Sequence, residues 1–140
     1  LNSLDLVENI NTDILYLDPP YNERQYLPNY HILETIAKYD NPTIKGVTGI
    51  RDYENKKSTF CNPKTALRDL ELIIQKSNFK HLILSYNSEG IISQEDIMAL
   101  MSNYGKVAFE QFLYARFKSN NNGLSKTKKT VYEQVYILTK

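Results

Sequence analysis

The chain has 140 residues, a net charge of +1 and one cysteine, Cys61. This length suits a single modest domain, the lone cysteine excludes an internal disulfide and a cysteine-based metal site, and the small charge excludes a uniformly basic nucleic-acid binder. An apolar content of 41% is ordinary for a globular protein, and we find no membrane-length apolar stretch and no signal-peptide pattern. We therefore expect a cytoplasmic protein with no membrane association.

The first elements that the pattern predicts are a strand and a helix. The strand covers residues 13–17, because Ile14-Leu15-Tyr16-Leu17 is an uninterrupted apolar run. A polar loop follows, and then a helix over residues 30–38 with Tyr30, Leu33 and Ala37 on one stripe. Residues 40–61 contain Pro42, Gly46 and Gly49 without apolar periodicity. We predict a long loop there, of a length that is usually functional or disordered.

The second half of the chain predicts two helices and three strands. Asn62-Pro63 signals a helix start, with Asn as N-cap and Pro in the first turn. An amphipathic stripe follows at Ala66, Leu67, Leu70, Ile73 and Ile74. Residues 81–86 are predicted to form the second strand, and the core of this segment is apolar without alternation, which is typical of a parallel strand covered on both faces.

The last helix and the C-terminal strands complete the predicted fold. Ser93 with Asp96 resembles a capping box, and Gly105 is expected to end the helix. Residues 106–114 and 131–138 predict two strands that pair as an antiparallel hairpin. The order strand, helix, strand, helix, strand predicts an α/β sheet in one domain, with parallel strands and this hairpin at the end.

The most informative motif is Asp18-Pro19-Pro20-Tyr21, which directly follows the first strand. Proline fixes its own φ and restricts the residue before it, so the acceptors of Asp18 and Pro19 are held in set directions. Tyr21 adds a ring for stacking. A strand-end acid, rigid carbonyls and an aromatic suit a flat ligand that carries an amine.

A second polar segment, Ser85-Tyr86-Asn87-Ser88-Glu89-Gly90, follows the second strand of the predicted sheet. Ligands of open α/β sheets bind beyond the carboxyl ends of the strands. We therefore expect this segment and Asp18 to face one crevice. The simpler interpretation of the motif, a turn after a strand, remains open on these residues alone.

The motif resembles the catalytic loop of amino-methyltransferases that use S-adenosylmethionine, and Asp at its first position resembles the adenine-specific DNA enzymes. The string from Tyr16 to Tyr26, followed by Asn29-Tyr30-His31 and later by Ser85 to Gly90, is similar to the Dam-like class of adenine-N6 methyltransferases. The resemblance implies a Rossmann-like methyltransferase sheet and a site-specific DNA methyltransferase. Bacterial restriction-modification systems contain enzymes of this kind.

The resemblance also implies roles for the motif. Asp18 and the Pro19 carbonyl would each accept one N–H of the adenine amine, so that its lone pair points at the donor's methyl group. Tyr21 would stack on an adenine flipped out of double-stranded DNA. The catalytic loop would consist of Asp18, Pro19, Pro20 and Tyr21. Asp18 would also lie near the amino-acid end of S-adenosylmethionine.

Other candidate residues for DNA or substrate contact have a structural alternative beside the functional one. Tyr30 and His31 either face DNA or serve as a packing tyrosine and a surface histidine. Ser85 and Asn87 either line the pocket or, for Asn87, cap the loop. No acid lies between Glu110 and Glu133, so phosphate contacts are expected from the basic residues of that span, which are Arg116, Lys118, Lys126, Lys128 and Lys129.

Weaker phosphate candidates lie in the long loop at Arg51, Lys56 and Lys57, and solvated side chains are the alternative there. His31 and His81 are isolated, so no metal site is predicted.

One motif of the Dam-like class is absent from the 140 residues, namely the Phe-x-Gly-x-Gly loop that cradles the cofactor. We therefore expect residues 1–140 to be the C-terminal part of a methyltransferase domain. Its partner would be an N-terminal half or a self-associating second chain, because the cut sheet leaves an unpaired edge. Methylation of an RNA guanine amine or a protein glutamine, and an inactive remnant, are the alternatives.

Overall fold

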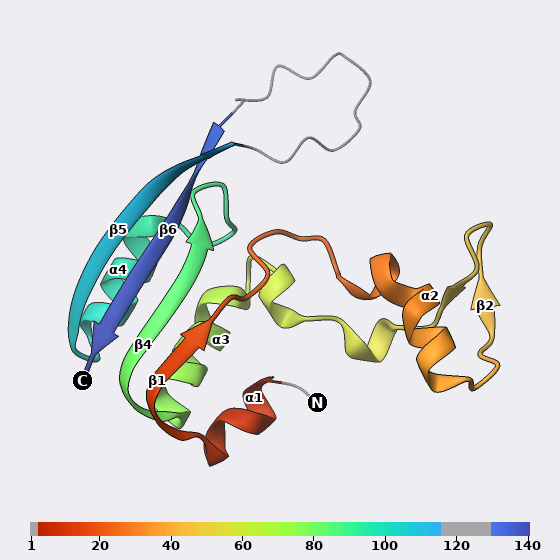
Figure 1. The fold of residues 1–140 in the computed structure, drawn as a ribbon, viewed down its shortest axis with the longest axis horizontal. Coiled ribbons are helices and arrows are strands. Elements are labelled where there is room, and N and C mark those ends of the chain that lie inside the picture. The colour runs from red at the N-terminus through yellow and green to blue at the C-terminus, as the bar shows by residue number, and fades with distance from the viewer. Residues whose placement is uncertain (1–2, 116–129) are drawn as a thin grey trace.

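A computed structural model describes residues 3–115 and 130–140 of the chain. Its main feature is a four-stranded sheet with the strand order β1-β4-β6-β5 (Figure 1). The strands are β1 (Asn11–Leu17), β4 (Asn78–Asn87), β5 (Lys106–Ala115) and β6 (Thr130–Thr139). β1 and β4 are parallel, whereas β6 is antiparallel to both β4 and β5. The predicted α/β class and C-terminal hairpin are confirmed.

Two helices, α3 (Ala66–Lys76) and α4 (Gln94–Ser102), cover one face of the sheet (Figure 1). The short helix α1 (Ser3–Leu6) and the 3-10 turn η1 (Val7–Asn9) lie against α3. The stripe predicted for α3 is confirmed, since its apolar side chains enter the core. The residues that are fully buried there include Leu70, Ile74, Leu82, Leu84, Ile97, Met101, Tyr136 and Leu138.

No described helix covers the opposite face of the sheet (Figure 1). The register places Tyr16 beside Ile83, and Ile83 beside Ile137, on this face. Ile14 and Tyr16 on β1 are 57% and 60% exposed. Strand β4 was expected to be covered on both faces. In the part of the chain that the structure describes, helices cover only one of them, so an apolar surface stays open.

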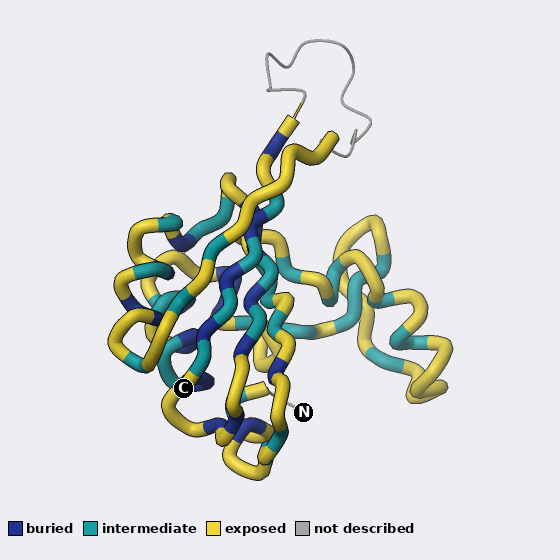
Figure 2. Tube along the Cα trace, turned by 60° about the vertical axis from the view of Figure 1, so that its left-hand side comes forward, coloured by how far each residue is buried: buried dark blue, intermediate teal, exposed yellow. Residues whose placement is uncertain are grey.

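A separate lobe stands away from the sheet on the right of Figure 1. It contains α2 (Leu27–Lys38) and the two-stranded ribbon of β2 (Ile44–Lys45) and β3 (Ile50–Arg51). The 3-10 turns η2 (Glu54–Lys56) and η3 (Thr59–Cys61) lead back toward α3. α2 has no buried residue, and most of the lobe is exposed or half-buried (Figure 2). The expected stripe on α2 therefore faces solvent instead of a core.

The prediction of a continuous loop over residues 40–61 was wrong in part. Two glycines with positive φ, Gly46 at 69° and Gly49 at 65°, form the turn that closes the β2–β3 ribbon. This ribbon has only two residue pairs, which is too short to leave a periodic pattern in the sequence.

Helix ends differ from prediction where turns precede or follow them. α3 begins at Ala66, because Asn62 forms a turn in which its side chain accepts from the Lys64 N–H at 3.0 Å. At α4, the Ser93 hydroxyl accepts from the Asp96 N–H at 3.1 Å, which confirms the predicted cap. α4 ends at Ser102. Gly105 lies beyond it, where a Cβ would collide with the Thr139 carbonyl.

Candidate active site at the carboxyl ends of the parallel strands

The two polar segments predicted to converge lie at the same edge of the sheet. The last residue pair of the parallel ladder is Leu17 with Leu84, so Asp18 and Ser85 come next on neighbouring strands. The segment after β4 is also joined to the motif directly. The Ile91 N–H donates to the Tyr21 carbonyl at 2.8 Å. The loops after β1 and β4 therefore form one continuous wall.

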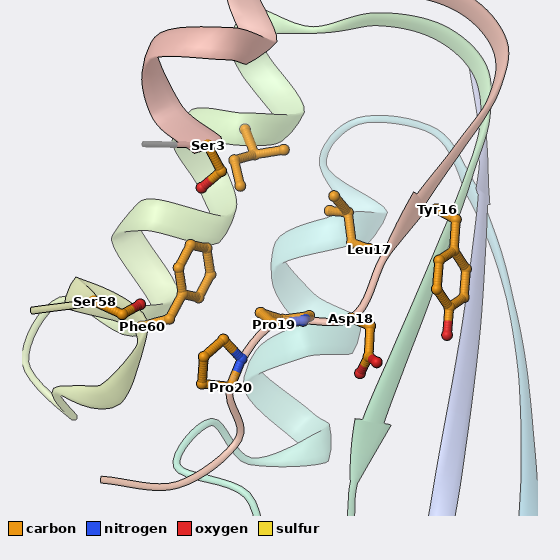
Figure 3. A pocket seen from close by; sticks show the side chains of 9 residues that line it. Ser3, Tyr16, Leu17, Asp18, Pro19, Pro20, Ser58 and Phe60 are labelled. Atoms are coloured by element: carbon orange, nitrogen blue, oxygen red, sulfur yellow. The ribbon is translucent and has the colours of Figure 1, made fainter. Parts of the chain in front are cut away.

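The motif presents acceptors and a ring to solvent. Asp18 is exposed and its carboxylate lies on the same side of β1 as Tyr16, whereas Leu17 points to the other side (Figure 3). Pro19 and Pro20 are half-buried, and proline offers only a carbonyl acceptor. The Tyr21 side chain is 39% exposed. An acid, fixed carbonyls and a ring are thus available together.

A cavity of about 260 Å³ adjoins the motif (Figure 3). Asp18 and Ser58 are among its polar lining residues, and its apolar wall includes Leu17, Phe60 and Ile73. Ligand pockets commonly measure roughly 300–1,000 Å³. This cavity is therefore smaller than a typical pocket for a whole ligand, and its carboxylate favours a cationic group there.

Tyr26 lies near the motif, although no sequence pattern selected it as a candidate. Its ring stacks on that of Tyr30, with centroids 6.1 Å apart and planes at 19°. Both rings are more than half exposed. Burial raises the pKa of the Tyr26 hydroxyl, and the nearby charges of Asp18 and Tyr21 raise it further. The only sequence signal was its position in the string that follows the motif.

The carboxyl end of β4 and the turn after it are held by their own contacts. The strand extends to Asn87, so Ser85, Tyr86 and Asn87 lie on β4, and only residues 88–90 of the predicted polar segment follow it. Asn87 is buried, its Nδ2 donates to Glu133 Oε1 at 2.9 Å, and its Oδ1 accepts from the Glu89 N–H at 2.9 Å. Both ends of this amide are engaged within the protein, which favours the loop-capping alternative for Asn87. The buried Tyr86 hydroxyl accepts from the Ile92 N–H at 3.3 Å. Burial raises the pKa of Tyr86.

A protein-family comparison identifies the evolutionary origin of this arrangement. Residues 2–100 match the model of the D12 class N6 adenine-specific DNA methyltransferases, and these residues include both polar segments. The chain belongs to this family. The Dam-like resemblance carried by Asp18 to Tyr21 is thereby confirmed.

The relatives of this D12-class chain are modification enzymes. It is 48% identical over 100 residues to the type II methyltransferase M.FokI of Planomicrobium okeanokoites, covering 71% of this chain and 16% of the relative. It is 42% identical over 137 residues to the modification methylase StsI of Streptococcus sanguinis, covering 96% and 20%. It is 40% identical over 136 residues to the type II methyltransferase M.NlaIII of Neisseria lactamica, and the match covers 96% of this chain and 40% of the relative.

The D12-class chain thus spans less than half the length of each of these three relatives. No solved structure matches it.

The basic residues predicted to contact DNA phosphates lie in two parts of the D12-class chain. Arg116, Lys118, Lys126, Lys128 and Lys129 lie outside the described residues. The side chain of Arg51 is 11% exposed and pairs with Asp40 at 2.6 Å. It is therefore engaged inside the lobe. Lys57 pairs with Glu54 at 2.7 Å.

Two further candidates lie on α2. Tyr30 is exposed and stacked, so the packing alternative does not describe it. His31 is half-buried, and its carbonyl accepts from the Thr35 hydroxyl at 2.7 Å.

The described residues contain neither a metal-binding cluster nor a helix that could span a membrane. Residues 3–115 and 130–140 contain no group of three His, Cys, Asp or Glu side chains placed to hold a metal ion. Over the same ranges, no helix combines the length and the apolar character that crossing a bilayer requires.

Proposed function

We propose that this protein transfers a methyl group to the N6 amine of adenine in double-stranded DNA, as part of a restriction-modification system. The observation that carries the proposal is the position of Asp18 to Tyr21, which lie beside Ser85 at the carboxyl edge of a parallel strand pair in a D12-class chain. The relatives' names support the restriction-modification setting. Such an enzyme works where bacterial DNA lies, which is the cytoplasm.

The residues present suit a poor nitrogen nucleophile. The lone pair of an adenine amine is delocalised into the ring. If Asp18 and the Pro19 carbonyl each accept one N–H, the nitrogen becomes pyramidal and its lone pair is freed for attack. Acceptors that are already fixed in place stabilise the positive charge that develops on the nitrogen, because they need not reorient during the reaction. The Asp18 carboxylate is also the nearest base of the motif for the proton that the nitrogen loses.

S-adenosylmethionine, when bound, supplies an electrophilic methyl group on a positively charged sulfur. The 260 Å³ cavity beside Asp18 fits one end of such a molecule, because it joins an exposed carboxylate to apolar walls at Phe60 and Ile73. We propose that Asp18 contacts the amino-acid end of this donor. The cavity is too small for the whole molecule, so the remaining contacts would come from other parts of the enzyme.

Access to the adenine requires that the base leave the DNA stack. We propose that Tyr21 stacks on the flipped base, which is supported by its partial exposure in the same motif as Asp18. Tyr30 and His31, on the helix that follows, are proposed to face the DNA. Ser85 is proposed to line the base pocket.

We propose that residues 1–140 form the C-terminal part of a Rossmann-like methyltransferase domain. Three observations support this. The parallel pair β1–β4 lies beside the β5–β6 hairpin, the described helices leave one face of the sheet uncovered, and the chain spans 16% to 40% of the three relatives' lengths. Its partner would be the N-terminal half of the domain or a second copy of the chain.

The test is transfer of labelled methyl groups by the full-length protein to DNA, with RNA and protein fractions as competing substrates. We expect label in DNA with the wild type and none with Asp18→Ala. Because Asp18 is exposed, Asp18→Ala should fold as the wild type does, and thermal melting of the two proteins checks this. Label in RNA or protein alone, or full activity of Asp18→Ala, would overturn the proposal.

A further inference from the structure

A side-chain amide closes the loop that carries the motif. The Ser58 N–H donates to Gln25 Oε1 at 2.7 Å, and Gln25 Nε2 donates to the Ser58 carbonyl at 3.1 Å. These reciprocal bonds join residues 33 positions apart and pair the side-chain amide of Gln25 with the backbone N–H and carbonyl of Ser58. Gln25 is half-buried, so the bonds are shielded in part from water.

The neighbouring contacts attach this clamp to the core. Cys61 Sγ donates to the Arg24 carbonyl at 3.4 Å, and Cys61 itself is buried together with Phe60. At the other end of the motif loop, the Tyr21 carbonyl accepts from Ile91. The loop from Tyr21 to Gln25 is therefore fixed at both ends, by the segment after β4 and by η3.

The lobe of residues 26–57 leaves and re-enters the body of the protein at this clamp (Figure 1). Its helix α2 has no buried residue, so core packing does not fix the direction of the lobe. On the far side of the clamp, Ser58 and Phe60 face Pro20 across the cavity beside Asp18 (Figure 3). One pair of hydrogen bonds thus links the lobe, the motif loop and the cavity wall.

We propose that Gln25 is a positioning residue for methyl transfer, which rests on the function proposed above. Its amide holds the motif loop and the base of the lobe in one geometry. Contact of the lobe with DNA is thereby transmitted to Asp18 and Tyr21. Small misplacements of reacting groups cost large factors in rate, which is why a residue without substrate contact affects turnover.

The bonding pattern specifies the residue type. A glutamine amide combines a donor and an acceptor at the end of the side chain, as the Ser58 backbone requires. Gln25→Glu keeps the acceptor for the Ser58 N–H but leaves the Ser58 carbonyl without its donor. Gln25→Ala removes both bonds. The two variants therefore form a graded series.

The experiment measures kcat and the KM for S-adenosylmethionine with the full-length protein and DNA free of N6-methyladenine. We expect Gln25→Ala to lower kcat by about 10- to 100-fold while KM changes by less than about threefold. Gln25→Glu falls between Gln25→Ala and the wild type. Gln111→Ala, at an exposed glutamine on β5, serves as the matched control and keeps wild-type kinetics.

Amide hydrogen exchange provides a readout that does not depend on activity. Residues 20–25 should exchange faster in Gln25→Ala than in Gln111→Ala, while α3 and β4 keep their protection. If Gln25→Ala does not fold, Gln25→Glu is compared with Gln111→Ala by the same criteria.

The outcomes separate the two proposals. If the wild type transfers methyl groups and Asp18→Ala does not, an unchanged kcat in Gln25→Ala or Gln25→Glu would overturn the positioning role alone. If the wild type methylates no adenine, the proposed function fails and the role in catalysis fails with it. Exchange data then show separately whether the clamp holds the loop.

Discussion

Two aromatic side chains follow the prolines of the motif, and their rings are presented to solvent beside a carboxylate. Tyr21 is 39% exposed and Tyr26 is 56% exposed, although burying such rings is normally favourable. Tyr26 also stacks on Tyr30. At a site proposed to receive a flipped base, exposed rings next to an acid offer a surface on which the base can stack.

Replacing the ring of Tyr21 should weaken catalysis more than removing its hydroxyl. Stacking of a base on an aromatic ring contributes about 1–3 kcal/mol, so Tyr21→Ala should lower kcat/KM by about 10- to 100-fold. Tyr21→Phe keeps the ring and should stay near the wild type. Steady-state kinetics on DNA check this, with His81→Ala, an exposed ring near the start of β4, as the control. Equal losses in Tyr21→Phe and Tyr21→Ala would exclude stacking.

Ionisation of Tyr136 should lower the free energy of unfolding at alkaline pH. It is fully buried, its hydroxyl donates to Gln134 Oε1 at 2.9 Å, and burial raises its pKa to about 12. The pKa of an unfolded tyrosine is about 10. Between these values the unfolded state loses a proton that the folded state keeps, so the contribution is complete below pH 10 and is lost as pH rises.

We expect the free energy of unfolding to fall by about 2–3 kcal/mol through Tyr136 between pH 10 and pH 12. Urea titrations at several pH values measure this change. Tyr136→Phe lacks the ionising group and should show a smaller decrease over the same range. An equal decrease in both proteins would contradict the assignment.

At the scale of elements, the turn after β4 depends on a glycine. A Cβ on Gly90 would overlap the Tyr86 ring and would approach the Asn87 carbonyl at 2.9 Å. Gly90→Ala should therefore destabilise the protein by about 1–3 kcal/mol, as overpacking generally does. Thermal or urea unfolding measures the cost.

A second background tests the cause of this cost. Tyr86→Leu removes the ring atoms that the new methyl group meets, so Gly90→Ala should cost less in Tyr86→Leu than in the wild type. The same cost in both backgrounds would show that the ring contact is not responsible.

Sequence patterns predicted the elements that pack against the core and failed where local turns decide. The stripe on α3 and the cap of α4 were correct, because burial and capping leave periodic or fixed-spacing signals. The start of α3 was placed too early, since Asn62-Pro63 forms a turn before the helix. α2 and the β2–β3 ribbon have almost no core contact, so no burial pattern could define them.

The site was predictable to the same extent. Asp18 lies beside Ser85 because β1 and β4 pair in parallel. The sequence predicted this proximity, since both residues were expected near the carboxyl ends of two parallel strands. The Gln25–Ser58 bridge and the proximity of Tyr26 to Asp18 were not predicted. Both depend on the path of residues 26–57, which returns to the motif through contacts far apart in sequence.

At the scale of the whole molecule, the described residues form a sheet with one face that their helices leave open and an edge strand, β1, that pairs only with β4 among them (Figure 1). Ile14 and Tyr16 expose apolar surface on this edge strand. Exposed edge strands with apolar side chains pair with other chains. The open face and edge together explain why residues 1–140 alone are expected to associate or to be marginally stable.

We expect residues 1–140 in isolation to self-associate, and Ile14→Lys to weaken that association. Sedimentation equilibrium over a range of concentrations measures both proteins. Val47→Lys changes an equally apolar side chain that is fully exposed on the lobe, and should leave association unchanged. A stable monomer with a high melting temperature would count against this prediction.

We propose that Asp18 to Tyr21 activate the N6 amine of adenine, and the identity of the methylated nucleoside decides whether they do. DNA free of modified bases is incubated with S-adenosylmethionine and the full-length protein, digested to nucleosides and analysed by mass spectrometry. We expect N6-methyldeoxyadenosine with the wild type and none with Asp18→Ala. Methylated cytosine in place of methylated adenine, or an undiminished yield from Asp18→Ala, would contradict it.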